Sequence, residues 1–321
     1  MEYVRLGSAG AKVSRICLGT MQFGNQSGWM MGIEAARPIM KRALDLGINF
    51  YDTANSYSDG KTEEIVGELL KDVREDIVLA TKVRSTVGKG VNDSGLSRLH
   101  IMREVERSLK RLQTDRIDLY QIHRWDYETP IAETLLALDD LVHAGKVRYI
   151  GASSMFAWQF AKALLTSDLL RISRFVSMQD HYNLAYREEE REMLPLCKDQ
   201  NIAVIPFSPL ARGFLSGKYR RGDTPNTPRY KGDQLLPERF FRPEDFDVAE
   251  RTEQVAREKG VTPSQIALAW LLHRGITAPI IGATKIEHVE EAVVAVGLKL
   301  SSDDMKRLEE PYKLHPIIAH N

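Results

Sequence analysis

The chain has 321 residues, of which 43% are hydrophobic and 27% charged, and its formal net charge is zero. Such a composition is typical of an ordinary soluble globular protein. A neutral chain offers no electrostatic footprint for nucleic acid or for an anionic membrane. No apolar stretch approaches the ~20 residues of a membrane span, and the first five residues are not a signal peptide. We therefore expect a cytoplasmic protein with one domain over residues 1–321 and without nucleic-acid or membrane partners.

Apolar runs alternate with amphipathic stretches along the chain. Runs at residues 4–6 and 12–13 flank a small turn, which predicts a hairpin on the floor of a barrel. Further strands are predicted at 16–18, 48–51, 77–81, 117–122, 147–150, 175–179, 203–207 and 277–281. Helices are predicted at 33–46, 63–73, 97–112, 131–144, 157–166 and 187–199. This alternation predicts an α/β fold, namely a parallel (β/α)₈ TIM barrel.

Local signals refine some of these elements. Gly47 follows the last apolar position of a predicted helix and is typical of a C-cap. Residues 262–265 (Thr-Pro-Ser-Gln) form a capping box that predicts another helix start. The charged stretch 187–192 is most simply a solvated first helical turn, in which acids are favoured by the helix dipole. Cys17 and Cys197 lie far apart in apolar surroundings, so we expect reduced core residues.

Two long segments interrupt the alternation of strands and helices. Residues 208–246 are rich in Gly, Pro, Arg and aromatic side chains, and residues 83–95 follow the third predicted barrel strand. Segments of this length are usually functional or disordered. Both leave the carboxyl ends of predicted strands, so we expect long loops over the C-terminal rim of the barrel.

Four ionisable residues are predicted to meet at that rim. Asp52, Lys82 and His123 each end or follow one of three consecutive predicted strands, and Tyr57 lies five residues after Asp52. The C-terminal rim is where barrel enzymes carry their chemistry. Singly, an Asp–Lys pair or a histidine at a strand end is more often structural than catalytic. Four such residues at one rim favour a functional site.

These residue types together suit proton donation. A tyrosine hydroxyl, with a pKa near 10, is a poor acid at neutral pH unless a positive charge stabilises its anion. Lys82 would supply that charge, Asp52 would hold Lys82, and His123 would hydrogen-bond a carbonyl oxygen. Hydride addition to an aldehyde or ketone needs such proton donation, and a cofactor would have to supply the hydride.

Several segments resemble the aldo-keto reductase family. Residues 50–57 (Phe-Tyr-Asp-Thr-Ala-Asn-Ser-Tyr) resemble its signature around the catalytic Asp and Tyr. Segments 79–82 and 121–124 resemble those that carry its Lys and His, and segments 149–154 and 279–284 match in sequence and order. Segments 179–184 and 208–213 are most similar to the branch that contains aryl-alcohol-dehydrogenase-like enzymes and potassium-channel β subunits. The resemblance covers nearly the whole chain, from about residue 6 to 308.

The resemblance implies that NADPH or NADP lies across the rim and that a small-molecule carbonyl compound is reduced. It implies a catalytic tetrad of Asp52, Tyr57, Lys82 and His123, with Tyr57 as the general acid. At the nicotinamide end it implies contacts from Gly19, Thr20, Met21, Asp52, Ser153, Ser154, Gln179 and Phe207. Around the pyrophosphate it implies Ser208, Pro209, Leu210, Arg212, Lys218 and Arg229. At the adenosine end it implies Gly282, Thr284, Lys285, His288 and Glu291.

The chain departs from the family pattern at a few positions. Ser154 stands where the family often has Asn, and His288 and Ala292 stand where Gln and Asn are common.

Substrate contacts are predicted for Trp125, Arg124 and Met21. An aromatic lining fits aryl or alkyl aldehydes, whereas Arg124 would suit a phosphate or carboxylate on a sugar-like substrate.

Other functions have weaker support in the sequence. No G-x-G-x-x-G follows a predicted strand, and no cluster has metal-ligand spacing, so neither a Rossmann site nor a metal is expected. The main alternative is an NADPH-binding regulatory subunit of the channel-β type with slow turnover, but those subunits carry Asn at the position of His123. A triose-phosphate-isomerase-like barrel without cofactor rests on the fold alone. The sequence does not define the oligomeric state.

Overall fold

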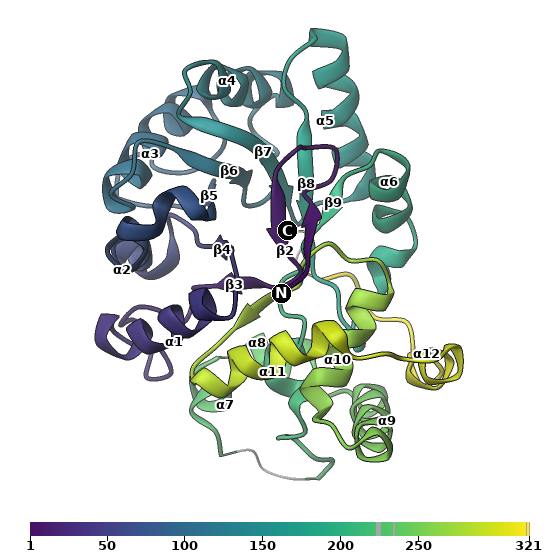
Figure 1. Ribbon diagram of the computed structural model, residues 1–321. Coiled ribbons are helices and arrows are strands. Elements are labelled where there is room, and N and C mark those ends of the chain that lie inside the picture. The colour runs from purple at the N-terminus through teal and green to yellow at the C-terminus, as the bar shows by residue number, and fades with distance from the viewer. Residues whose placement is uncertain (223–225, 234, 319, 321) are drawn as a thin grey trace.

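The computed structural model describes residues 1–222, 226–233, 235–318 and 320 (Figure 1). Within them, eight parallel strands form one sheet in the order β10-β3-β4-β5-β6-β7-β8-β9. The strands are β3 Cys17–Gly19, β4 Phe50–Asp52, β5 Val78–Val83, β6 Ile117–Ile122, β7 Val147–Ser153, β8 Phe175–Gln179, β9 Ala203–Val204 and β10 Ile280–Gly282.

The edge strands β9 and β10 close the sheet through separate contacts. The Thr277 N–H donates to the Val204 carbonyl at 2.9 Å, and the Ile280 N–H donates to the Pro206 carbonyl at 2.9 Å. Phe207 then forms an isolated parallel bridge with Ile280. The sheet is therefore a closed ring of parallel strands, and the predicted (β/α)₈ barrel is confirmed.

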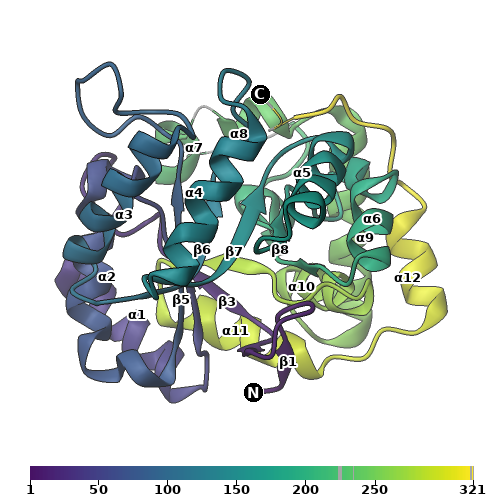
Figure 2. The same ribbon diagram turned by 90° about the horizontal axis from the view of Figure 1, so that it is seen from above.

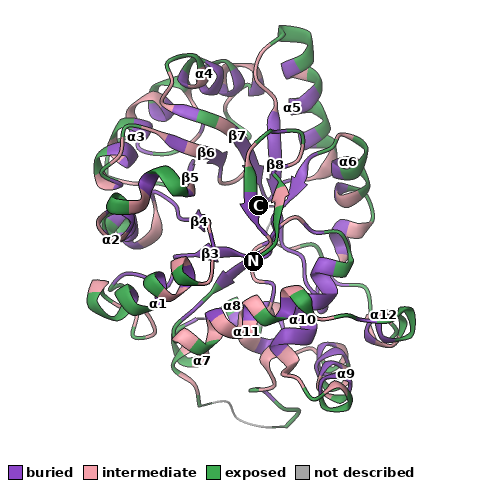
Figure 3. Cartoon of the chain, in the orientation of Figure 1, coloured by how far each residue is buried: buried purple, intermediate pink, exposed green. Residues whose placement is uncertain are grey.

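Helices surround this ring (Figure 1), and their inward faces are buried (Figure 3). They pack on the strands because their apolar positions recur at helical spacing. Their bounds are α1 Ile33–Asp45, α2 Lys61–Leu70, α3 Arg98–Arg111, α4 Ile131–His143, α5 Ala157–Leu170, α6 Met193–Asp199, α7 Pro228–Gly232, α8 Leu235–Arg239, α9 Pro243–Lys259, α10 Pro263–His273, α11 Ile286–Gly297 and α12 Ser302–Glu309. No helix among the described residues is both long and apolar enough to cross a membrane.

The predicted N-terminal hairpin covers the barrel floor. Strands β1 (Tyr3–Arg5) and β2 (Lys12–Ser14) pair antiparallel, and Leu6 is buried among the side chains inside the barrel. Gly7 has φ +60°, and a Cβ there would lie 2.6 Å from the Ala203 nitrogen, so only glycine lets this turn seat against the strands. Figure 2 shows the hairpin at one end of the barrel and α7, α8 and the C-terminus at the other.

Three local predictions from the sequence are confirmed: the end of α1, the start of α10 and the burial of the two cysteines. Gly47 has φ +80° and its N–H donates to the Leu44 carbonyl at 2.9 Å, which ends α1 as predicted. The Thr262 side chain accepts from the Gln265 N–H at 3.2 Å and completes the capping box of α10. Cys17 and Cys197 are free and buried. Burial raises the pKa of both thiols, which favours the uncharged form of each.

The prediction of one solvated helix over residues 187–199 is wrong. The structure has a 3₁₀ turn at Glu188–Glu190, followed by the separate helix α6. Glu189 is only 3% exposed, and the Glu188 carboxylate accepts from the Tyr312 hydroxyl at 2.7 Å and the His315 N–H at 2.8 Å. Glu188 is covered by Tyr312 and His315, which lie more than 120 positions later in the chain. The periodicity of residues 187–199 contains no information about such a distant contact.

The long segment 208–246 is not a plain loop. It contains a 3₁₀ turn at Ala211–Ser216, the short helices α7 and α8, and the start of α9; its residues 223–225 and 234 lie outside the described part. Figure 2 places α7 and α8 at the rim end of the barrel. The predicted long chain segment over the C-terminal rim is therefore present there.

Candidate active site

The carboxyl ends of three neighbouring strands bring the predicted tetrad together. Asp52 is the last residue of β4, Lys82 lies near the end of β5, and His123 directly follows β6. Pairing in register aligns Lys82 with Gln121 on the next strand. Tyr57 opens the 3₁₀ turn Tyr57–Gly60 that follows β4. The barrel thus places all four side chains at one end, as the strand pattern predicted.

The Lys82 ammonium is the centre of this group. It is fully buried, lies 2.5 Å from Asp52 Oδ2, and donates to the Thr53 carbonyl at 2.8 Å. It also lies 3.3 Å from the Tyr57 hydroxyl oxygen. Three oxygen partners satisfy the three N–H donors of an ammonium, which makes burial of this charge tolerable. The Tyr57 hydroxyl is therefore held beside a fixed positive charge.

The Asp52 carboxylate is fixed from both sides. Its Oδ1 accepts from Gln121 Nε2 at 3.0 Å and from Gln179 Nε2 at 2.9 Å, while Oδ2 faces Lys82. Gln121 was not among the predicted site residues. Its signal in the sequence is an amide between Tyr120 and Ile122 near the end of a predicted strand, at a position that the structure buries completely. These bonds leave Asp52 in one orientation, which in turn orients Lys82.

A strained turn presents Tyr57. Ser58 and Asp59 have φ +48° and +53°, in the left-handed region that L-residues rarely adopt. Each such residue costs about 1–3 kcal/mol, and such strain is often found at functional sites. The half-buried Tyr57 ring packs edge-on against the His123 ring, with 5.9 Å between centroids and 77° between planes.

The local charges follow from these contacts. Burial alone would lower the pKa of Lys82, but the Asp52 carboxylate and the Tyr57 oxygen outweigh burial and raise it. Burial lowers the pKa of His123 well below its usual value, helped by the positive charges of Lys82, Arg124 and Arg84. At neutral pH the site therefore holds an ammonium and an uncharged imidazole.

Residues predicted for the nicotinamide end gather around Asp52. The Thr20 N–H and hydroxyl both donate to the Asp52 carbonyl at 2.9 Å. Gln179 reaches the same aspartate through its side chain. Ser153 pairs in register with Gln179, and the Ser153 and Ser154 hydroxyl oxygens lie 3.3 Å apart in the interior. Gly19 ends β3 in register with Asp52, and the half-buried Met21 follows two residues later.

Phe207 provides a flat surface at the same end of the barrel. One face stacks on His181, with 5.1 Å between ring centroids and 12° between planes. The Arg124 guanidinium carbon lies 5.8 Å from the Phe207 centroid. His181 was not predicted as a site residue.

The two arginines predicted for the pyrophosphate share one carboxylate. Arg212 and Arg229 both form ion pairs with Asp233, the latter at 2.7 Å. The Arg229 guanidinium also lies 4.1 Å from the Trp29 ring centroid. Ser208 and Arg212 have φ +52° and +58°, in the turn that also contains Pro209 and Leu210. Asp233 was not among the predicted site residues, although its four-residue spacing from Arg229 is a common pattern for ion pairs on a helix.

The residues predicted for the adenosine end cluster at the start of α11. The Thr284 N–H donates to His288 Nδ1 at 3.3 Å. Burial, followed by the charges of Lys218 and Lys285, lowers the pKa of His288. Burial raises the pKa of Glu291, and Lys218 opposes that shift. Gly282 is exposed at the end of β10, beside the N-terminus of α11.

Two of the predicted substrate residues, Arg124 and Trp125, directly follow His123 in the loop after β6, whereas Met21 follows β3. Trp125 is 8% exposed and packs 6.3 Å from Trp158, so it is partly a packing residue. Burial lowers the pKa of Arg124 to about 10. Within the described part of the chain, Arg124 forms no ion pair and donates only to the neighbouring His123 carbonyl at 2.9 Å.

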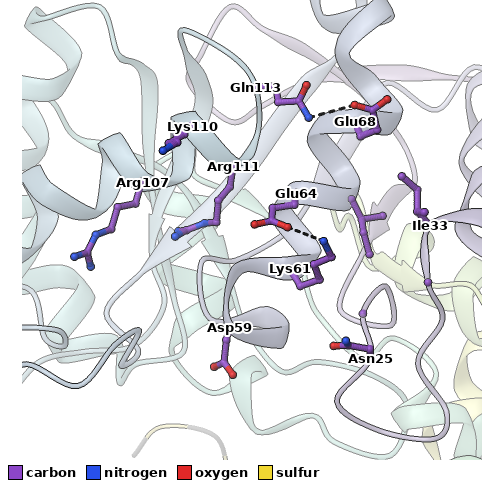
Figure 4. A pocket seen from close by; sticks show the side chains of 13 residues that line it. Asn25, Ile33, Asp59, Lys61, Glu64, Glu68, Arg107, Lys110, Arg111 and Gln113 are labelled. Carbon is purple, nitrogen blue, oxygen red and sulfur yellow. Dashed lines mark hydrogen bonds and ion pairs between the residues drawn. The ribbon is translucent and has the colours of Figure 1, made fainter.

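One cleft of the structure lies outside the tetrad. It has a volume of about 940 Å³ and lies between α2, α3 and the loop after β3 (Figure 4). Its charged walls pair among themselves, as Lys61 does with Glu64 and Gln113 does with Glu68. None of the tetrad lines it. The cleft therefore does not contain the predicted catalytic residues, and the candidate active site remains at the C-terminal rim.

The residues at the rim fit a phosphorylated nicotinamide cofactor. Ser153, Ser154 and Gln179 are neutral hydrogen-bonding groups suited to a carboxamide, and Phe207 offers a flat face for a ring. Lys218 and Lys285 form no ion pairs among the residues that the structure describes, and the charges of both reach His288. Unpaired ammonium groups beside a helix N-terminus suit phosphate.

Comparisons with known proteins agree with this geometry. Residues 15–313 match the sequence profile described as the aldo/keto reductase family. The chain is 40% identical to a versiconal hemiacetal acetate reductase of Aspergillus parasiticus, over 98% of this chain and 99% of the relative. It is 40% identical to an aldo-keto reductase of Fusarium vanettenii, over 100% and 94% of the two chains.

A further relative supports the predicted branch of the family. A Saccharomyces cerevisiae protein, provisionally named as an aryl-alcohol dehydrogenase, is 39% identical over 98% of this chain and 97% of its own length. Matches of this identity over the full length establish common descent and a shared fold. The chain therefore belongs to the aldo/keto reductase family and is an oxidoreductase.

Proposed function

We propose that the protein reduces aldehydes or ketones to alcohols with NADPH, and that Tyr57 is the general acid. The single observation that carries the proposal is the Lys82 ammonium, which lies 2.5 Å from Asp52 Oδ2 and 3.3 Å from the Tyr57 hydroxyl, next to an uncharged His123. When bound, the reduced nicotinamide supplies the hydride that the carbonyl carbon accepts.

The tetrad provides the other half of the reaction, which is a proton for the carbonyl oxygen. Tyr57 donates its hydroxyl proton as that oxygen becomes negative, and the adjacent Lys82 stabilises the tyrosinate that remains. Asp52 keeps Lys82 protonated and in place. The uncharged His123 can donate one hydrogen bond to the same oxygen without competing for the proton, which orients the carbonyl toward Tyr57.

The cofactor would lie along the rim in an extended form. We assign the carboxamide to Ser153, Ser154 and Gln179, and the nicotinamide ring to Phe207. Gly19, Thr20 and Met21 would border this end. Ser208, Pro209, Leu210, Arg212, Lys218 and Arg229 would surround the pyrophosphate, with Asp233 holding both arginines. Gly282, Thr284, Lys285, His288 and Glu291 would hold the adenosine end.

The substrate would approach between Tyr57, His123 and the side chains of Trp125, Arg124 and Met21. Aromatic surface at Trp125 suits an aryl aldehyde, which is consistent with the names of several relatives. The intact tetrad favours an enzyme over a cofactor-binding regulatory subunit, because His123 is present and lies beside Tyr57.

The test is a fluorescence titration with NADPH, followed by an activity panel. The panel compares aryl aldehydes, methylglyoxal and phosphorylated sugars, with NADPH oxidation as the readout. Saturable NADPH binding and turnover of an aldehyde are the expected results. Isomerisation of a sugar phosphate without cofactor, or binding of NADPH without turnover of any carbonyl compound, would contradict the proposal.

A further inference from the structure

Behind the proposed nicotinamide surface lies a stack of three aromatic rings. His181 stacks on Phe207 at 5.1 Å and on Tyr186 at 4.7 Å, and both pairs have 12° between planes. Phe240 meets the His181 ring edge-on at 5.7 Å and 83°. Both His181 and Tyr186 are essentially inaccessible to solvent. His181 therefore has no route to substrate, and its contact with the site is through Phe207.

The backbone fixes His181 against Phe207. The two residues form a parallel bridge beyond the ends of β8 and β9, and the Phe207 N–H donates to the Asp180 carbonyl at 2.9 Å. Side chains two positions apart on a strand point to the same side, so His181 continues the row that begins with Gln179. The pairing of the strands therefore sets the spacing between the two rings.

Hydrogen bonding defines the charge of the His181 ring. Asn183 Nδ2 donates to the Ser208 carbonyl at 3.1 Å and lies 3.3 Å from His181 Nε2. An amide NH₂ can only donate, so Nε2 must be the acceptor and the ring is uncharged. Burial, together with the positive charges of Arg239 and Arg212, lowers the pKa of His181 well below its usual value. Both observations agree on a neutral ring.

The C-terminal segment holds the outer ring of the stack. The Tyr186 hydroxyl accepts from the Ile318 N–H at 3.2 Å, and the His315 ring meets Tyr186 edge-on at 5.3 Å. His315 itself is anchored by its N–H, which donates to Glu188 at 2.8 Å. The stack is thus held between the paired strands on one side and His315 and Ile318 on the other.

We propose that His181 is a positioning residue: it fixes the plane of Phe207 and thereby the nicotinamide that stacks on the other face. The inference rests on the proposed function, because it needs a nicotinamide on Phe207. A neutral ring is required there, since the oxidised nicotinamide is a cation and a protonated imidazole one layer below would repel it. The alternative is that His181 only fills space in the core.

A double-mutant cycle separates these two roles. The variants are H181L, H181F, F207L and the double variant H181L/F207L, with dissociation constants for NADPH and NADP⁺ measured by fluorescence titration. Stacked aromatic pairs contribute enough that H181L should weaken both cofactors roughly threefold to tenfold. H181F keeps a flat ring and should stay within about twofold of the wild type. In the F207L background, H181L should add almost nothing, because the surface through which it acts is gone.

A matched control reports on structure alone. Phe160 stacks on Phe175 at 6.0 Å and 23° between a helix and a strand, away from the tetrad. F160L should lower the melting temperature but leave both dissociation constants unchanged. If H181L behaves like F160L, or weakens binding equally with and without Phe207, the positioning role is overturned. If H181F is as weak as H181L, the flat ring is not what matters and the inference also fails.

The same experiment distinguishes this inference from the proposed function. A wild type that binds no NADPH overturns both. A wild type that binds NADPH and reduces an aldehyde, with H181L unchanged, overturns only the role of His181. If F207L binds NADPH as tightly as the wild type, Phe207 is not the nicotinamide surface. The inference about His181 then fails as well, while the assignment of the tetrad stands.

Discussion

The Lys82 ammonium lies 3.3 Å from the Tyr57 hydroxyl and 5.0 Å from the centroid of the Tyr57 ring. The charge thus faces the oxygen that must carry a negative charge after proton transfer, and it is shielded from water. A fixed charge in a water-excluded site stabilises such an anion more than it would in solvent. The same contact makes Tyr57 the side chain on which the proposed reaction depends most directly.

Replacing Tyr57 by Phe should leave NADPH affinity nearly unchanged and reduce kcat by roughly 10²–10⁴, the usual contribution of a general acid. The ring and its edge-on packing against His123 remain, so the loss reports on the hydroxyl. Steady-state kinetics and NADPH titration measure the two effects. Y127F, at a tyrosine that is 63% exposed, is the matched control and should behave as the wild type. Near-normal turnover of Y57F would remove Tyr57 from the mechanism.

Replacing Lys82 by Met should reduce both activity and stability. It removes the charge beside Tyr57 and leaves the buried Asp52 carboxylate with only its two glutamine donors. Breaking one side of a buried ion pair typically costs about 3–5 kcal/mol, which denaturant unfolding can measure. K41M breaks only the exposed pair with Asp45 and should cost less than about 1 kcal/mol.

The stability effect has an internal check. The double variant D52N/K82M removes both charges, so it should recover part of the stability lost in K82M without recovering activity. A K82M variant as stable as the wild type would show that Asp52 is readily accommodated without its partner. In that case the buried pair would not be the feature that holds this part of the rim together.

The pH dependence of activity should lack the step expected from an ordinary histidine. The lowered pKa of His123 means that the imidazole stays uncharged as the pH falls past about 6.5, the usual value for histidine. Because the pKa of Lys82 is raised, its charge persists at alkaline pH up to and beyond about 10.4. With a neutral aldehyde as substrate, kcat/KM should therefore not fall near pH 6.5 because of His123. H123Q is the control, because replacing the imidazole would remove any fall that His123 causes. A loss there that H123Q removes would contradict a neutral His123.

Much of the site was predictable because it depends on one-dimensional features. Asp52, Lys82 and His123 follow apolar runs, and in a parallel barrel the ends of such runs necessarily share a rim. Tyr57 could be placed by its short distance in sequence from Asp52. The hairpin and the helix caps were predictable for the same reason, since each depends on a few adjacent residues.

The residues that sequence reasoning missed are those whose partners are remote. His181 is defined by a bridge between two strand ends. Asp233 has one partner nearby in sequence, Arg229, but its second partner, Arg212, lies 21 positions earlier. The acids at 188–189 looked like solvated residues because the C-terminal residues that cover them are more than 120 positions away. Composition and periodicity describe one segment at a time, so they cannot show which distant segment packs on it.

Preference for NADPH over NADH should depend on Lys285. This residue is the N-cap of α11 and is exposed, and its charge reaches His288 in the same cluster as Lys218. The free N–H groups at the start of a helix favour an anion, and an ammonium beside them adds a full charge. Together with Thr284 they suit the 2′-phosphate that NADPH carries and NADH lacks.

Replacing Lys285 by Ala should raise the Kd for NADPH roughly tenfold, or ~1.4 kcal/mol, and leave the Kd for NADH almost unchanged. K299A is the matched control, because Lys299 is an exposed lysine just beyond the other end of α11. The difference between K285A and K299A should shrink at high salt, since screening weakens an exposed charge–phosphate contact. Equal weakening of both cofactors in K285A would mean that Lys285 supports the adenosine end or the helix in general. The preference for the phosphorylated cofactor would then have to come from another residue of the cluster.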